Sequence, residues 1–203
     1  MIAFRQFLRK YGITLLPVSV ETTKPADILK KEKRGHFPYT HLGKVIEKPA
    51  STWKDVWVGA SITQESVSRT LSLNGKYSLK SMGVNINGGL AKAKSATYTI
   101  SGIKAKKLET TDTMEIENFL TDIKSKKPAV WKKIRGKSFV EMTFYATEFT
   151  ISFDVEGNVD LSAEVAGKLT HAAGASVKWT SKTVLKIAKN DNIPFGVKMF
   201  KIK

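Results

Sequence analysis

Two groups of basic residues are the part of this sequence best suited to bind a charged ligand. Residues 124–137, KSKKPAVWKKIRGK, hold seven basic residues and no acidic one, and the N-terminal stretch MIAFRQFLRKYG adds three more. Clusters of this kind attract the phosphate groups of either a lipid surface or a nucleic acid. The basic residues that we single out are Arg5, Arg9, Lys10, Lys126, Lys127, Lys132, Lys133 and Arg135.

The charge of the whole chain points to the same kind of partner. The 203 residues include 34 lysines and arginines against 18 acidic residues, a net charge of +16. Only five of these cations are arginine. Arginine is preferred for hydrogen bonds to base edges and for bidentate contacts with phosphates, whereas lysine suffices for diffuse attraction to a charged surface. The balance therefore favours an anionic membrane as the partner and argues against a nucleic acid.

The residues of catalytic and metal sites are scarce. The chain has no cysteine, and its three histidines, His36, His41 and His171, are scattered without carboxylates at ligand spacing. The glycines of GVNINGG lack the order of a phosphate-binding loop and sit among strand-like segments. We therefore expect neither an enzyme nor a metal or cofactor site.

Residues 138–155, SFVEMTFYATEFTISFDV, show the strongest strand pattern. Apolar residues alternate with polar ones on both sides of a break at Thr147 and Glu148, which predicts an antiparallel hairpin. Such a hairpin is either half buried in a soluble sheet or able to line a pore, because each arm approaches the length of a tilted membrane strand. Its apolar phase comprises Val140, Met142, Phe144, Phe149, Ile151 and Phe153.

A second strand pair is predicted earlier in the chain. Its apolar residues are Val84, Ile86, Tyr98 and Ile100. Asn74-Gly75 is the strongest hairpin-turn signal in the region, and Asn87-Gly88-Gly89, which would join these strands, is a second candidate. The region can thus fold in two ways, and only one gives a long hairpin from these four residues.

The remaining segments predict short helices and further strands. Helical spacing or start signals occur at residues 2–11, 25–29, 112–123 with Asp112 as the N-cap, 128–134 and 161–169. Residues 35–51 predict little regular structure, whereas residues 13–20, 53–58, 176–181, 183–188 and 195–202 predict strands. The chain is expected to form a single α+β domain with a twisted, mostly antiparallel sheet and short helices.

The order of these segments resembles that of the gasdermin family, specifically the pore-forming domain of its bacterial members. The similar stretches are FRQFLRKYGITLLPVSVETTKPADIL, KLETTDTMEIENFLTDIK, FVEMTFYATEFTISFDVEGNVDLSAEVAG and NIPFGVKMFKI. Three features depart from the family pattern: the chain lacks an N-terminal cysteine that could be lipidated, it is somewhat shorter, and it shows no inhibitory tail after the final strand.

The resemblance implies a cell-death effector that is cytoplasmic when inactive. It would bind anionic lipid of the inner membrane through the basic residues, form a homo-oligomer and insert two strand pairs per protomer into a large β-barrel. The apolar residues named above for the two strand pairs would face lipid. An activating protease or a paired regulatory protein would control it, in antiphage defence. The alternative is a soluble basic α+β module that binds nucleic acid.

Overall fold

The computed structural model describes residues 8–16, 23–32, 35–45, 54–60, 65–70, 85–86, 93–165, 169–170 and 176–203. Its central element is β9 (Ser138–Val155), a strand of 18 residues. The predicted hairpin within this segment is wrong, because both halves of the alternating pattern belong to one continuous strand. The break at Thr147 and Glu148 has another cause, a bend in the sheet.

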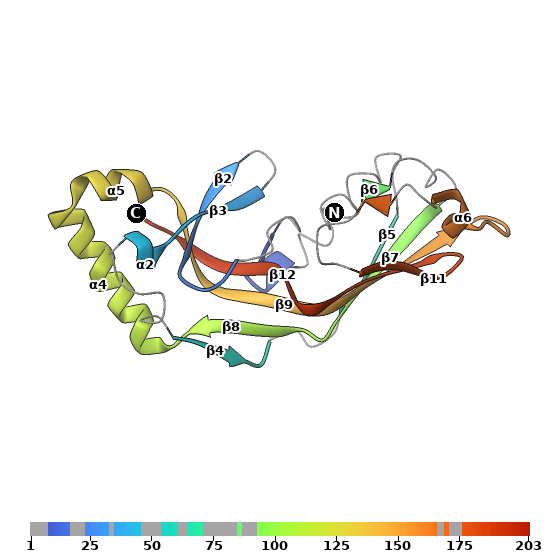
Figure 1. The fold of residues 1–203 in the computed structure, drawn as a ribbon, viewed down its shortest axis with the longest axis horizontal. Coiled ribbons are helices and arrows are strands. Elements are labelled where there is room, and N and C mark those ends of the chain that lie inside the picture. Colours follow the sequence, from blue (N-terminus) through green and yellow to red (C-terminus); the bar gives the residue numbers. More distant parts are fainter. Residues whose placement is uncertain are drawn as a thin grey trace.

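β9 is paired along both of its edges, always with antiparallel neighbours (Figure 1). On one edge β12 (Val184–Lys201) follows it for most of its length. The other edge is shared by β2 (Asp27–Glu32), β8 (Lys104–Leu108) and β7 (Ala93–Ser101). This arrangement confirms the predicted α+β fold with a mostly antiparallel sheet.

The other strands extend this sheet outward. β1 (Thr14–Leu15) and β11 (Ser176–Ser181) pair with β12, β3 (Gly35–His41) with β2, β4 (Asp55–Val58) with β8, and β5 (Glu65–Thr70) with β7. The sheet thus has ten strands. A separate pair is formed by β6 (Asn85–Ile86) and β10 (Leu169–Thr170).

The sheet bends partway along β9 and β12 (Figure 1), and the register of these two strands is interrupted at Thr147. On one side Gly102, between β7 and β8, adopts a φ of +63°, and the Thr147 side chain fills the place of the missing Cβ. Thr147 Oγ1 also donates a hydrogen bond to the Ser101 carbonyl oxygen, at 3.3 Å. On the other side β12 has four residues, 189–192, between the partners of Glu148 and Ala146. Because both neighbours are irregular here, the apolar phase of β9 shifts while the strand continues.

Two predictions near the N-terminus are wrong. The expected helix at residues 25–29 is a turn followed by β2, and the expected irregular stretch from Gly35 is the strand β3. β2 forms because Ile28 and Leu29 are fully buried beside β9, with Ile28 opposite Phe139. Of the predicted N-terminal helix, residues 8–10 are helical and residues 2–7 lie outside the described part. The short helix α2 (Leu42–Val45) follows β3.

Two predicted helices form a corner at one end of the sheet, near the C-terminus (Figure 1). α4 (Thr110–Lys126) starts after Glu109, so Asp112 is not its N-cap. α5 (Pro128–Ile134) begins at the proline that predicted it, and α6 (Leu161–Val165) covers the first part of the expected helix at 161–169.

The two strands expected at 183–188 and 195–202 are one strand, β12.

Candidate functional site

The half of the sheet beyond the bend is a ribbon of adjacent strands, which we call the arm. It consists of β5, β7, β9 from Glu148, β12 up to Ala188, and β11. Partners across antiparallel strands lie on the same face of a sheet. The register of these strands therefore shows which side chains gather on each face of the arm.

One face of the arm is apolar and buried. Its side chains form three rows across the strands, and none is more than 5% exposed. The rows are Ile100, Phe149 and Ile187; Tyr98, Ile151 and Leu185; and Ala96 and Phe153.

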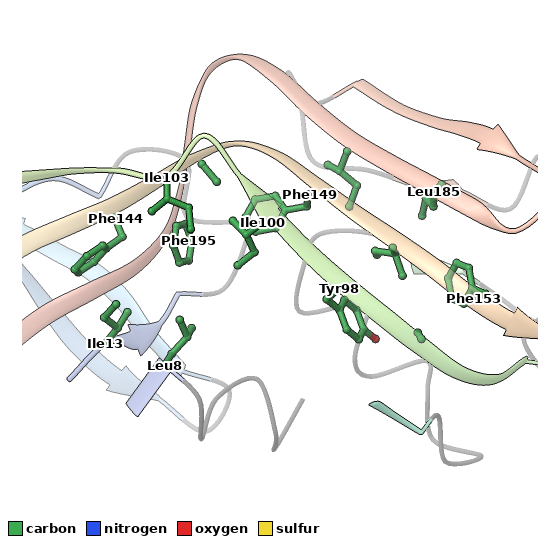
Figure 2. Close-up of a cluster of buried hydrophobic side chains, with 14 of the residues drawn as sticks. Leu8, Ile13, Tyr98, Ile100, Ile103, Phe144, Phe149, Phe153, Leu185 and Phe195 are labelled. Atoms are coloured by element: carbon green, nitrogen blue, oxygen red, sulfur yellow. The ribbon is translucent and has the colours of Figure 1, made fainter. Parts of the chain in front are cut away.

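The apolar face is part of a larger cluster, which includes residues of β11, of the near half of β12 and of other elements (Figure 2). The ring of Phe149 meets that of Phe195 edge to face, with centroids 5.9 Å apart. The ring of Phe153 lies 5.9 Å from that of Trp179 in β11. Leu8, Ile13 and Leu161 belong to the same cluster. In this state the apolar face of the arm is thus an internal surface of the protein.

The opposite face of the arm is polar. Thr97 lies opposite Ser152, and Thr99 lies opposite Thr150. Near the bend Glu148 forms an ion pair with Lys186 of β12 and accepts a hydrogen bond from Thr150 Oγ1 at 3.0 Å. The hydrogen bond from Lys186 is the main reason why the pKa of the Glu148 carboxyl is lowered. Across β7, β9 and β12 the arm is therefore amphipathic, with one apolar and one hydrophilic face.

The structure brings together half of the residues predicted to face the membrane. Tyr98, Ile100, Phe149, Ile151 and Phe153 all lie on the apolar face of the arm. Met142 and Phe144 pack with the same cluster on the near side of the bend.

Val140 does not share their face. Glu141 is an extra residue in β9, because Met142 lies opposite Lys198 whereas Val140 lies opposite Met199. This bulge turns Val140 into a separate cluster with Leu16, Leu29 and Val197.

The predicted first strand pair also has a different partner. β7 pairs with β5, so that Ile100 lies opposite Glu65 and Thr70 lies opposite Ser95. Ile86 instead belongs to β6, where it lies opposite Leu169. Val84 and both candidate turns, at Asn74-Gly75 and Asn87-Gly88-Gly89, lie outside the described residues.

Two residues of the apolar face, Leu185 and Ile187, are absent from the predicted set. They lie on β12, whose distal part is the second neighbour of β9 in the arm. Their alternation with Lys186 has the period of two expected for a half-buried strand. This alternation predicts that Leu185 and Ile187 share an apolar face, but it does not indicate that their strand is a neighbour of β9.

The predicted basic residues fall into two places. Lys126, Lys127, Lys132, Lys133 and Arg135 are exposed on α4, α5 and the residues next to them. Of these, Lys126 forms an exposed ion pair with Asp122, at 3.1 Å. Arg9 and Lys10 are also exposed, but the neighbouring Leu8 packs with the arm cluster and not with the helices. Arg5 lies outside the described residues.

We call these exposed cations of α4, α5 and the residues next to them the basic corner. A pocket of about 190 Å³ lies beside it. Lysines contribute to its wall, and the side chains of Leu120, Trp131, Phe200 and Ile202 make it largely apolar. Lys124 Nζ stands 5.7 Å from the centre of the Trp131 ring. The lining consists of Leu120, Thr121, Lys124, Trp131, Phe200, Lys201, Ile202 and Lys203. Such a lining suits a group with a negative charge next to an apolar part.

The buried ionisable groups lie away from these surfaces, around β2 and the middle of β9. Burial raises the pKa of Asp27 to about 6, although its carboxylate accepts a hydrogen bond from the Lys24 N–H at 2.9 Å. Burial likewise raises the pKa of Tyr145 to about 12, and its hydroxyl donates to the Thr23 carbonyl at 3.2 Å. Among the described residues no three His, Asp or Glu side chains are placed to hold a metal ion.

A twisted antiparallel sheet with an amphipathic arm defines the class of protein to which this chain belongs, a gasdermin fold. Its sequence matches the Bacterial Gasdermin Family over residues 16–203, and the chain is a member of that family. The solved structure of a bacterial gasdermin from Bradyrhizobium tropiciagri matches it with a TM-score of 0.57 at 14% sequence identity. That match covers 95% of this chain and 82% of the other. None of the curated proteins matches the sequence.

Family and fold together support a pore-forming, gasdermin-like protein. The family suggests contact with membrane lipid and assembly into oligomers, and its fold is not that of an enzyme. Within the described part of the chain, no helix is long and apolar enough to cross a membrane.

Proposed function

We propose that the protein forms membrane pores by inserting four strands of each protomer into a transmembrane β-barrel. These strands are β5 and β7 as one hairpin, and β9 and β12 as the other. The observation that supports this proposal is the amphipathic arm, in which these four strands already lie side by side. A barrel satisfies every backbone hydrogen bond in lipid, and its strands need one apolar and one hydrophilic face.

Each face of the arm then has a role in the pore. Side chains such as Ile100, Phe149 and Ile151, which are buried in the single molecule, face lipid in the barrel. Thr99, Thr150 and Lys186 line the aqueous side. The same alternation thus serves both states, because the apolar face exchanges a protein core for hydrocarbon.

Lipid docking in this proposal uses the basic corner of α4 and α5. Its exposed cations are Lys126, Lys127, Lys132, Lys133 and Arg135. A lysine or arginine near an anionic surface gains about 1 kcal/mol, so four or five of them gain about 4 to 5 kcal/mol. That corresponds to roughly a thousandfold in binding. Arg5, Arg9 and Lys10 form the second, separate contribution.

The test is dye release from lipid vesicles. Residues 1–203 are expected to release dye from phosphatidylcholine vesicles that contain phosphatidylglycerol, and not from phosphatidylcholine alone. Binding should weaken steeply with salt, because exposed charges are screened within about 8 Å at physiological ionic strength. Tight binding to nucleic acid with no release from either vesicle would instead support the nucleic-acid module.

We extend the proposal to the death of the producing cell. The inactive protein would reside in the cytoplasm and the pore in the inner membrane. A protease or paired protein would control it during phage infection, and residues 1–203 expressed without that control would be active. Expression of residues 1–203 in bacteria should then cause loss of membrane potential before loss of viability. Growth at the normal rate with abundant intact protein would contradict this part of the proposal, while the vesicle result would stand by itself.

A further inference from the structure

The arm contains one strand more than the two hairpins of the proposed pore. Its strands follow in the order β5, β7, β9, β12 and β11, and each neighbouring pair is antiparallel. Among the described strands, β5 and β11 are the outer ones. Within the described residues β11 pairs with β12 alone, opposite Val184 to Ala188.

The number of strands matters when identical copies close into a ring, as the proposed function requires. The last strand of one copy must pair with the first strand of the next, and rotation about the ring axis preserves strand direction. Directions alternate along the arm, so β5 and β11 run the same way and would meet as a parallel pair. β5 and β12 run in opposite directions and would meet as an antiparallel pair, which is the pairing of transmembrane barrels.

Either outer strand could be lost to give an even number, and the structure distinguishes them. β5 is joined to β7 by six consecutive register partners without interruption. β11 has five partners on β12, and its register shifts between Trp179 and Ser181. Among the described residues, the buried Trp179 indole N–H also finds no hydrogen-bond partner, which weakens the packing of this strand. β11 is therefore the strand that is easier to remove.

We propose that the edge of β12 from Val184 to Ala188 is the surface that receives β5 of a second copy of the chain, and that β11 is a removable cap on this edge. The contact is a ladder of main-chain hydrogen bonds, as in other cases where a strand is added to a sheet edge. A capped edge cannot pair with another molecule. The cap thus keeps single molecules apart until β11 leaves.

A reversible tether tests this inference. The chain has no cysteine, so Ser176→Cys with Ala188→Cys allows a single disulfide between β11 and β12. These residues are register partners on the polar face, where Cα atoms lie about 4.5 to 5.5 Å apart, within the range of disulfides. The inward side chains of Val177 and Trp179 are not altered. The matched control is Ser68→Cys with Thr97→Cys, which tethers β5 to β7 at another register pair.

Both variants are assayed oxidised and reduced on vesicles of phosphatidylcholine with phosphatidylglycerol. The oxidised β11–β12 tether should sediment with vesicles but release no more dye than vesicles without protein, and reduction should restore release. The β5–β7 tether should release dye in both forms. Release by the oxidised β11–β12 tether, or a block by both tethers, would overturn the assignment of β11 as the cap. A block by the β5–β7 tether alone would make β5 the strand that leaves. Reduced variants and wild type that release no dye would instead refute the proposed pore.

Discussion

An arginine at Val155 is expected to abolish dye release, whereas an arginine at Ser152 is expected to leave it largely intact. Both substitutions add one positive charge to the distal half of β9. Val155 is half buried and packs on the apolar side of the arm, whereas Ser152 is exposed opposite Thr97 on the polar side. Ile151 is a poorer target, because it is 0% exposed and an arginine there would unfold the single molecule.

Val155→Arg is expected to cost the soluble fold little and the membrane pore much more. Complete burial of a valine contributes about 1.5 to 3 kcal/mol, so losing the half-buried Val155 side chain costs about 1 kcal/mol of unfolding free energy. The aliphatic part of arginine replaces some of that contact. Val155 is seven residues beyond Glu148, about 24 Å along the strand. With a strand tilt of about 40°, it lies about 18 Å into an apolar band about 25 Å tall if the strand enters lipid at the bend.

At that depth an arginine on the lipid face costs about 2 kcal/mol in every protomer, and a ring multiplies the cost by its number of subunits. The soluble fold should survive the change, but the pore should not. Dye release is compared for the two variants and wild type, with vesicle sedimentation and urea unfolding as controls. Equal release by Val155→Arg and Ser152→Arg, in proteins of equal stability, would refute the proposed orientation of the arm.

Three further predictions concern other parts of the molecule. Reversal of two charges in the basic corner, Lys132→Glu with Lys133→Glu, should weaken binding to anionic vesicles by at least about 30-fold. Losing the attraction of two lysines costs about 2 kcal/mol, and the new carboxylates add repulsion. The same reversal at the exposed Lys54 and Lys104 should have a smaller effect, and equal effects would reject the corner as the docking surface. Asp27 has a pKa of about 6 in the fold against 3.8 for the free group. Between these values the native state retains a proton that the unfolded state loses, so the free energy of unfolding should fall as pH rises through this interval. Asp27→Asn should remove this part of the pH dependence in urea unfolding at pH 4 and pH 7, and unchanged dependence would show that burial does not perturb the carboxyl. Gly102→Ala should destabilise the protein by more than about 2 kcal/mol, because the new Cβ overlaps the Thr147 side chain in addition to the cost of a positive φ. The control is Gly157→Ala, which has a φ of +74° and no atom within 4 Å of the Cβ and should cost only about 1 kcal/mol. Equal losses in urea unfolding would mean that the overlap at the bend is relieved elsewhere.

Local signals in the sequence predict the helices and the faces of the strands well. α4 and α5 form where helical spacing and Pro128 predict them. The alternation of Tyr98 and Ile100, and of Phe149, Ile151 and Phe153, correctly predicts a common apolar side. These properties depend on the chemistry of residues two to four positions apart, so a single sequence contains them. The segment after Pro25 is one exception, because burial of Ile28 and Leu29 beside β9 overrides its local preference. Val140 is another, because the bulge at Glu141 turns it away from the predicted face.

Strand partners depend on distant residues, and there the sequence misleads. A two-residue loop in a hairpin and a bend in one long strand produce the same shift of apolar phase, so residues 138–155 fit both. What decides is Gly102, 45 residues before Thr147, together with the four residues of β12 that lie between the partners of Ala146 and Glu148. Because the irregularities occur in both neighbours at the same level, β9 can continue through the bend and keep its hydrogen-bonded ladders on either side. The arm is therefore a continuation of the sheet that packs on the helices, and a change at Gly102 should alter the direction in which the arm leaves that sheet without altering the pairing of β7 with β9.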